Sequence, residues 1–230
     1  EFDMGSRTVV ATFGEGCYFA GYDVALPTEY AYKSKSEGGI WEEGDLRRDE
    51  SIRYDFTYLG ITPTEVSWGA DELDPHIKKY EDERTDQFNG NLANEWYSGK
   101  NFIVLRYADV LLCYAECLNE LGETGEANTV VNQVRARAWG GTLPNEMAWN
   151  YGQDEFRVQI MDERIRELCF EGWRRMDLIR TGKFVELIKE RNPWAKKSGT
   201  IKEFHMRWPI PDTEIKNNSD ISEEDQNPGY

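Results

Sequence analysis

Three glutamates near the middle of the carboxy-terminal half have the residue type and spacing that acid–base chemistry needs. Glu163, Glu167 and Glu171 follow one another at intervals of four, which places them along one face of a helix. Two carboxylates are the minimum for glycoside hydrolysis, one as the acid and one as the base or nucleophile. Several arginines lie among them, however, and alternating charges at helical spacing also stabilise a helix or tie it to its neighbours. We expect the structural role, with a glycosidase as the less favoured alternative.

No other pattern in the sequence indicates an enzyme or a cofactor. There is no glycine-rich phosphate loop with its lysine, no HExxH and no Gly-x-Ser-x-Gly. His76 and His205 are the two histidines, and neither lies beside a nucleophile. Cys113 and Cys117 share a helix face, but a zinc site would need two further ligands nearby. Their neighbours are apolar, so we expect both cysteines to be small buried residues, with no metal, no cofactor and no catalytic residue.

Aromatic side chains are the stronger candidates for ligand contacts. The chain has eight Trp and twelve Tyr, many of them in glycine-rich stretches of the first hundred residues. Flat sugar faces can rest on such rings while polar neighbours bond the hydroxyls, although core packing is the commoner role of any single ring. The predicted ligand-binding residues are Tyr18, Tyr32, Trp41, Trp68, Tyr80 and Trp96.

The charge and hydropathy of the chain narrow the classes of partner. A net charge of −16 disfavours nucleic acid, whose phosphates require clustered Lys and Arg. No apolar run approaches the roughly 18 residues of a membrane helix, and no signal or lipidation motif is present. The chain begins at Glu1 rather than Met. We therefore expect a soluble piece of a longer protein whose membrane anchor lies outside it.

The elements that position the candidate residues fall into two regions. Residues 1–100 predict a loop-rich region with short strands, because glycines interrupt it every ten to twenty residues. Residues 101–230 predict a helical region. Loops rich in glycine and aromatic residues are typical of binding surfaces carried on a scaffold, so we place the ligand face in residues 1–100.

Apolar spacing predicts the helices of the second region. A helix over residues 102–121 is apolar around most of its circumference, so we expect it to be surrounded on most sides, and Gly122 ends it. A second helix over residues 126–139 completes a hairpin of the size of one tetratricopeptide-like unit. A lone unit cannot bury its own face, so its partners are expected upstream. Further helices are predicted over residues 154–170 and 174–180, and Pro193 is expected to close the helical region.

Four stretches in this region resemble, in order, the signature elements of the SusD/RagB family. The first two are Leu105 to Glu120 and Asn132 to Ala138, which contains Asn-x-x-Arg-x-Arg. The third is Glu163 to Glu167 with Phe170 to Arg180, and the fourth is Pro209-Ile210-Pro211 with the terminal Gln226 to Tyr230. We expect the charged signature residues to form buried ion pairs that fasten helices; they are Arg106, Glu116, Arg135, Glu167, Glu171 and Asp177.

The resemblance implies a mainly α fold, in which tetratricopeptide-like helices pack against a loop-rich region that carries the ligand site. It also implies a non-catalytic protein, lipid-anchored on the outer face of the outer membrane. There it would cap a SusC-like TonB-dependent transporter and capture oligosaccharides, or in some members peptides. Ligand-contacting aromatics follow no motif in the family, so none is transferred to this chain. Glycan capture is the leading hypothesis, and peptide capture is the alternative.

Overall fold

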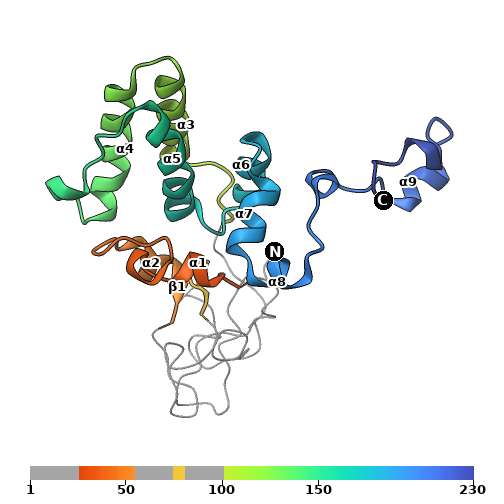
Figure 1. The fold of residues 1–230 in the computed structure, drawn as a ribbon, viewed down its shortest axis with the longest axis horizontal. Helices are drawn as coiled ribbons and strands as arrows, with labels where there is room; N and C mark the ends of the chain where they lie inside the picture. Colours follow the sequence, from red (N-terminus) through yellow and green to blue (C-terminus); the bar gives the residue numbers. More distant parts are fainter. Residues whose placement is uncertain (1–25, 55–74, 81–100) are drawn as a thin grey trace, which may run out of the picture. The chain divides into compact units, whose positions relative to one another are not determined.

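The computed structural model of the chain describes residues 26–54, 75–80 and 101–230. Most regular structure in this part is helical, and its strands form a single short antiparallel pair (Figure 1). The predicted mainly helical fold class is confirmed. The chain divides into two compact units, Glu1–Arg174 and Arg175–Tyr230. The predicted boundary near residue 100 stays a prediction, because much of residues 1–100 lies outside the described part.

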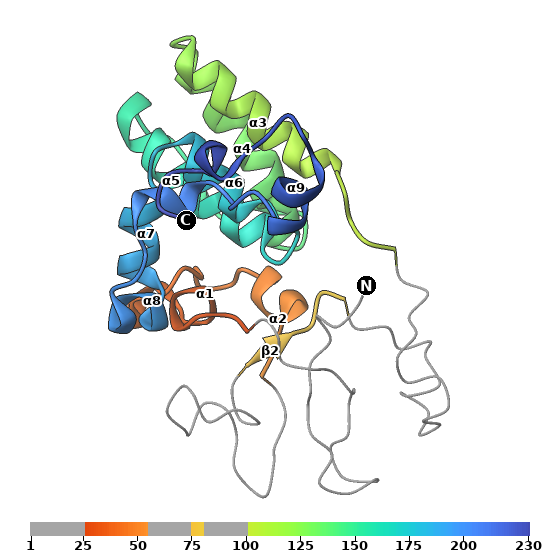
Figure 2. The same ribbon diagram turned by 90° about the vertical axis from the view of Figure 1, so that its right-hand side faces the viewer.

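The first unit contains three long helices that lie side by side in both ribbon views (Figures 1 and 2). They are α3 (Tyr107–Glu120), α4 (Thr124–Ala138) and α5 (Gln153–Leu168). The apolar positions predicted from helical spacing meet between them and form the main core, which includes Leu112, Ala115, Leu118, Val131, Val134, Phe156 and Ile160. The pairing of α3 with α4 is the predicted helical hairpin.

The two ends of α3 compare differently with the prediction. The helix begins at Tyr107, five residues later than expected, and residues 101–106 precede it without regular structure. It ends as predicted at Gly122, whose φ of 86° suits glycine. The Gly122 N–H donates to the Asn119 carbonyl and the Glu123 N–H to the Leu118 carbonyl, which is the Schellman arrangement.

The expectation that α3 is surrounded on most sides is wrong within the described structure. One side of the helix packs on α4 and α5, but several apolar side chains on the other side are more than 40% exposed. The same geometry corrects the prediction for Cys113 and Cys117, which are exposed because they lie on that outer side. Cys169 is buried in a separate apolar cluster.

Two asparagines of α4 fix the segment that leads into α5, which contains the 3-10 turn η5 (Asn145–Met147). The Asn132 side chain accepts from the Trp149 N–H at 2.7 Å and donates to the Trp149 carbonyl at 3.1 Å. Asn128 makes the same pair of bonds with Tyr151. The two residues are one helical turn apart, so they pair with alternate residues of an extended chain as a neighbouring strand would.

The described part of the amino-terminal region lies against the carboxy-terminal end of α5. It contains α1 (Glu29–Tyr32), η1 (Lys35–Glu37), α2 (Arg47–Ser51), and the strands β1 (Ile52–Arg53) and β2 (His76–Ile77). Figure 2 shows the paired strands beside α2, and Ile52 lies opposite Ile77 in the pairing. A second apolar cluster forms here from Ile40, Trp41, Ile52 and Cys169.

The second unit is a series of short helices. They are α6 (Arg174–Arg180, which begins at the last residue of the first unit), α7 (Phe184–Arg191), α8 (Pro193–Ser198), η6 (Glu203–Met206), α9 (Asp212–Asn217) and η7 (Glu223–Asp225). The predicted helix over residues 174–180 is confirmed, but Pro193 opens a helix rather than closing the region. Proline is accepted at a first helical position, where no N–H is needed, and the Asn192 side chain caps the next two amides.

The end of the chain folds back within the second unit. The Gln226 side chain accepts from the Ile210 N–H at 2.8 Å and donates to the Ile210 carbonyl at 2.9 Å. Tyr230 packs edge-on against Phe204, and Gly229 lies so close to the Phe204 ring that a Cβ would collide with it. These contacts explain why glycine stands next to the last residue.

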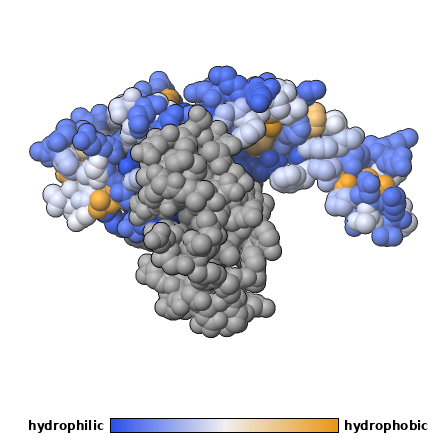
Figure 3. Space-filling model, turned by 90° about the horizontal axis from the view of Figure 1, so that it is seen from below, coloured by the Kyte–Doolittle hydropathy of each residue, from blue (hydrophilic) through white to orange (hydrophobic). Residues whose placement is uncertain are grey.

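The described surface is mostly hydrophilic in the view of Figure 3, where apolar residues form small separate groups. This agrees with the mean hydropathy of −0.72. Among the described residues, no helix combines the length and the apolar character needed to cross a membrane.

Candidate ligand-binding aromatics and the ion pairs beneath them

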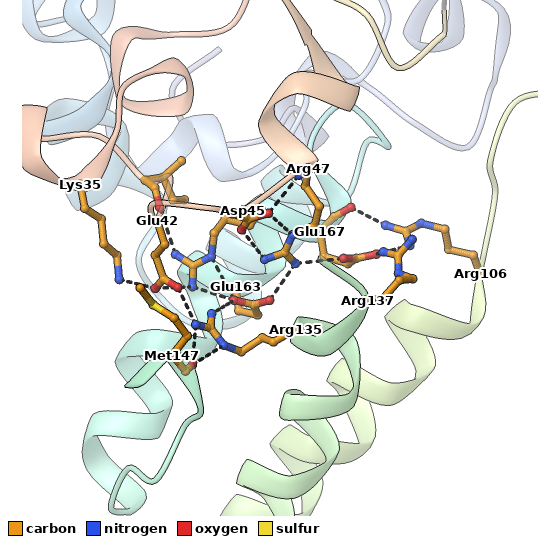
Figure 4. Close-up of polar contacts among 12 residues, drawn as sticks. Lys35, Glu42, Asp45, Arg47, Arg106, Arg135, Arg137, Met147, Glu163 and Glu167 are labelled. Carbon is orange, nitrogen blue, oxygen red and sulfur yellow. Dashed lines mark hydrogen bonds and ion pairs between the residues drawn. The ribbon is translucent and has the colours of Figure 1, made fainter. Parts of the chain in front are cut away.

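The first unit contains a row of buried, ion-paired carboxylates that begins on α5. Glu163 is fully buried, and its two oxygens accept from three guanidinium groups (Figure 4). Arg47 Nη1 lies 2.8 Å away, Arg135 Nη1 2.9 Å and Arg166 Nη2 2.7 Å. Glu163 therefore joins α2, α4 and α5 through ion pairs.

Glu167 and Glu171 continue the row past the end of α5. Glu167 pairs with Arg47 at 3.0 Å and with Arg106 and Arg137. Glu171 pairs with Arg106 Nε at 2.9 Å and with Lys79 Nζ at 2.6 Å. Both glutamate side chains are fully buried, so these charges are shielded from solvent.

The cations of this network come from segments far apart in the sequence. Arg47 lies on α2, Lys79 in the segment 75–80, Arg106 before α3, and Arg135 on α4. The row on and after α5 thus joins four parts of the first unit. The predicted ion pairs that fasten helices are confirmed for Arg106, Arg135, Glu167 and Glu171. Glu116 Oε1 lies 3.8 Å from Arg164 Nε. Asp177 pairs with Arg180, which lies three residues later on the same helix.

The electrostatics of these carboxylates oppose a catalytic role. Burial favours the neutral form of Glu163, but the Arg47, Arg166 and Arg135 guanidinium groups outweigh it and hold the pKa well below its usual range. Burial likewise opposes ionisation of Glu167, and Arg47 and Arg106 lower its pKa. A glycosidase acid needs a raised pKa and access to its substrate. Glu163 and Glu167 have neither, so they act as permanent counter-charges.

Tyr80, a predicted ligand-binding residue, stacks on an aromatic residue that the sequence reasoning missed. Its ring lies parallel to that of Phe102, with 5.9 Å between the centroids and 7° between the planes. Phe102 is 56% exposed, whereas the Tyr80 hydroxyl is buried and has no hydrogen-bond partner among the described residues. Burial, with Glu171 nearby, raises the pKa of Tyr80 to about 12, so the hydroxyl keeps its proton.

Phe102 was not predicted as a ligand-binding residue, because apolar spacing assigned it to the first helix. The available signal was its position directly after Lys100 and Asn101, the polar setting that selected the other candidates. The network anchors residues that lie near each ring in the sequence. Lys79, next to Tyr80, donates to the Glu167 and Cys169 carbonyls, and Arg106 follows Phe102 by four residues.

Tyr32, a second predicted residue, belongs to another aromatic group. Its half-buried ring meets the Tyr54 ring edge-on at 5.3 Å between centroids. The Arg48 guanidinium lies 4.8 Å from the centre of the Tyr54 ring, within range of a cation–π contact. Burial raises the pKa of Tyr32, so this hydroxyl also stays protonated.

The remaining predicted residues divide between the core and the residues not described. Trp41 is 2% exposed in the second apolar cluster, and its indole N–H donates to the Ala31 carbonyl at 2.5 Å. It offers no ring face to a ligand in this structure, so it is not part of the site we propose. Tyr18, Trp68 and Trp96 lie outside the described residues. Within the described part, no group of three His, Cys, Asp or Glu side chains is arranged to hold a metal ion.

Comparison with known proteins gives a consistent family assignment. A sequence model of the SusD family matches residues 17–230. SusD-like protein P2 of Formosa agariphila is 31% identical over 222 residues, which cover 93% of this chain and 41% of that protein. Starch-binding protein SusD of Bacteroides thetaiotaomicron is 28% identical over 159 residues, which cover 67% of this chain and 26% of that protein. The chain therefore spans less than half the length of these relatives.

A solved structure extends the similarity to the fold. A SusD superfamily protein from Bacteroides vulgatus matches 94% of this chain and 47% of its own chain, with a TM-score of 0.67 and 24% sequence identity. At that identity the match concerns the fold alone. Because the family model covers nearly the whole sequence, the chain belongs to the SusD family.

Proposed function

We propose that the intact protein binds an oligosaccharide or polysaccharide at the cell surface without cleaving it. In this proposal it is lipid-anchored to the outer face of the outer membrane and delivers its ligand to a TonB-dependent transporter. Family membership and the similarity to a protein named starch-binding support the choice of ligand class. The anchor, the transporter and the identity of the glycan are parts of the proposal.

The observation that carries the proposal is the Tyr80–Phe102 pair. The exposed Phe102 ring, backed by the parallel Tyr80 ring, offers a flat apolar face of the kind on which a sugar ring can rest. Lys79, next to Tyr80, and Arg106, four residues after Phe102, are anchored to Glu171 by ion pairs, which limits the movement of both segments. Stacking worth on the order of 1 kcal/mol for each of two or three rings gives micromolar to millimolar affinity.

The glycosidase alternative receives no support from the carboxylate row. The acids that the sequence pattern suggested are Glu163, Glu167 and Glu171, and these side chains are buried and paired with Arg or Lys. The binding role needs none of them to change protonation.

Substitution of Phe102 tests the proposal directly. With the intact protein and a glycan that it binds, Phe102→Ala should weaken binding about fivefold, the equivalent of ~1 kcal/mol of lost stacking. Val158→Ala is the control, because Val158 is also an exposed apolar side chain but lies on α5 of the same unit. Equal affinity in the wild type and both variants, measured by isothermal titration calorimetry, would remove Phe102 from the site. Binding of peptides but no glycan would favour the alternative ligand class.

A further inference from the structure

A short basic segment lies in the second unit of a chain that is acidic as a whole. Residues 191–202 contain four basic residues and no acidic one, whereas the whole chain has a net charge of −16. Lys196 and Lys197 are both exposed, and no carboxylate among the described residues lies within ion-pair distance of either. Trp194 precedes them and is 68% exposed. We call Trp194, Lys196 and Lys197 the α8 patch, because all three lie on α8.

The local structure of α8 places the patch on the outside of its unit. The Asn192 side chain accepts from the Trp194 and Ala195 N–H groups at 3.0 and 3.1 Å, which fixes where the helix begins. The helix packs on α7 (Figures 1 and 2), and of its six residues, all of them described, only Ala195 is partly buried. Lys197 follows Trp194 by three residues, so the two side chains lie on the same side of the helix. An indole ring and an ammonium group are therefore presented to the outside together.

This combination of side chains matches the chemistry of a lipid surface that carries phosphate groups. Tryptophan is enriched where proteins meet the headgroup level of a membrane, because its ring is apolar while its N–H is polar. Lysines beside it that have no carboxylate partner can approach the phosphates of anionic lipids. We propose that the α8 patch contacts an anionic lipid surface. The proposal goes beyond glycan capture and takes from the proposed function only the location at a membrane.

The acidic character of the chain does not prevent this contact, because the interaction is local. At physiological ionic strength, exposed charges more than about 8 Å apart are largely screened from one another. Residues 190–203 contain four basic residues and two acidic ones, Glu190 and Glu203, so the segment that would meet the lipid has a net charge of +2. Glu190 Oε1 lies 3.8 Å from Arg191 Nε, which offsets part of that acid. Binding through the patch should therefore be weak and strongest at low salt.

Sedimentation with vesicles tests the proposal. The intact protein, produced without its lipid anchor, is mixed with vesicles of phosphatidylcholine and phosphatidylglycerol in equal parts, and the pelleted fraction gives a partition coefficient. We expect binding that weakens as salt is added. Lys196→Gln combined with Lys197→Gln should lower the partition coefficient by on the order of 25-fold, because each basic residue near an anionic surface contributes about fivefold. Trp194→Ala should weaken binding but keep its dependence on salt.

Two control variants separate the charge of the patch from general effects of substitution. Lys196→Arg combined with Lys197→Arg keeps both charges and should bind as the wild type does. Lys216→Gln removes an exposed lysine on α9, outside the patch, and should leave the partition coefficient nearly unchanged.

Three results would overturn the proposal. They are no pelleting at low salt, equal pelleting of the wild type and the double Gln variant, and binding to polygalacturonate in place of vesicles, which would assign the patch to an acidic polysaccharide. Glycan affinity is measured on the same preparations and should be the same in every variant. A failure of the proposed glycan binding is thereby distinguished from a failure of lipid contact.

Discussion

Removal of one buried charge from the carboxylate row is the sharpest test of its role. Glu163→Gln keeps the size of the side chain and removes the negative charge that faces Arg47, Arg135 and Arg166. The side chains of Arg135 and Arg166 are at most 1% exposed, so water cannot replace the lost counter-charge. The guanidinium groups would then repel one another at a site held together by their shared partner.

The expected loss follows from the cost of an uncompensated buried charge. Breaking a buried ion pair by removing one partner costs about 3–5 kcal/mol. Arg47 retains Asp45 and Glu167, and Arg135 retains Glu42, which keeps the estimate within that range despite three affected cations. In a domain of this size each kcal/mol lowers the melting temperature by roughly 2–4 °C, so the melting temperature of the unit should fall by about 6–20 °C.

Thermal unfolding followed by circular dichroism measures this change, with urea unfolding to give the free energy. Asp154→Asn is the matched control, because it makes the same chemical change on α5 at a side chain that is 95% exposed. The control should melt within about 2 °C of the wild type, since exposed ion pairs contribute little. If Glu163→Gln melted as the wild type does, the row would not fasten the unit as we describe.

Three further predictions follow from the same structure. The pKa values of Glu42, Glu163 and Glu167 are lowered by folding, so below about pH 4.5 the unfolded state binds more protons, and the free energy of unfolding should fall with pH there. Urea titrations at about pH 7 and about pH 3.5 measure this, and a free energy independent of pH would contradict it. Glu171→Ala should lower the melting temperature without changing which glycans bind in a panel, and a stable variant with altered specificity would contradict that structural role. Gly229→Ala should destabilise the second unit by about 1–3 kcal/mol because its Cβ meets the Phe204 ring. The control Gly125→Ala should not destabilise the protein in this way, because an added Cβ there contacts no atom within 4 Å.

The sequence was sufficient to predict the helices because their local signals agree with their packing. Apolar spacing located α3, α4 and α5, and Gly122 marked the end of α3 through its positive φ. Pro193 misled because proline disfavours the interior of a helix but suits its first position, and only the Asn192 cap distinguishes the two. Residues of the same type can thus end or begin a helix according to one neighbouring side chain.

The candidate site was harder to predict because exposure depends on tertiary contacts. Trp41 and Tyr80 both have polar neighbours in sequence, yet Trp41 is buried while Tyr80 stacks on an exposed ring. Cys113 and Cys117 have apolar neighbours and are nevertheless exposed, because the apolar arc of α3 is wider than the face its unit covers. Charged residues were more predictable, because the signature stretches named several of them and buried Arg and Glu need partners; the partners themselves, such as Arg47 for Glu163, come from distant segments that helical spacing does not indicate.

The central claim is that the intact protein binds a glycan and does not cleave it. The most direct measurement is a binding screen of the intact protein against a panel of polysaccharides, with chromatographic analysis of products from the same samples. Our account predicts saturable binding to one class of polysaccharide, with micromolar to millimolar affinity and chain length unchanged after prolonged incubation. Release of shorter oligosaccharides that depends on the protein would contradict it.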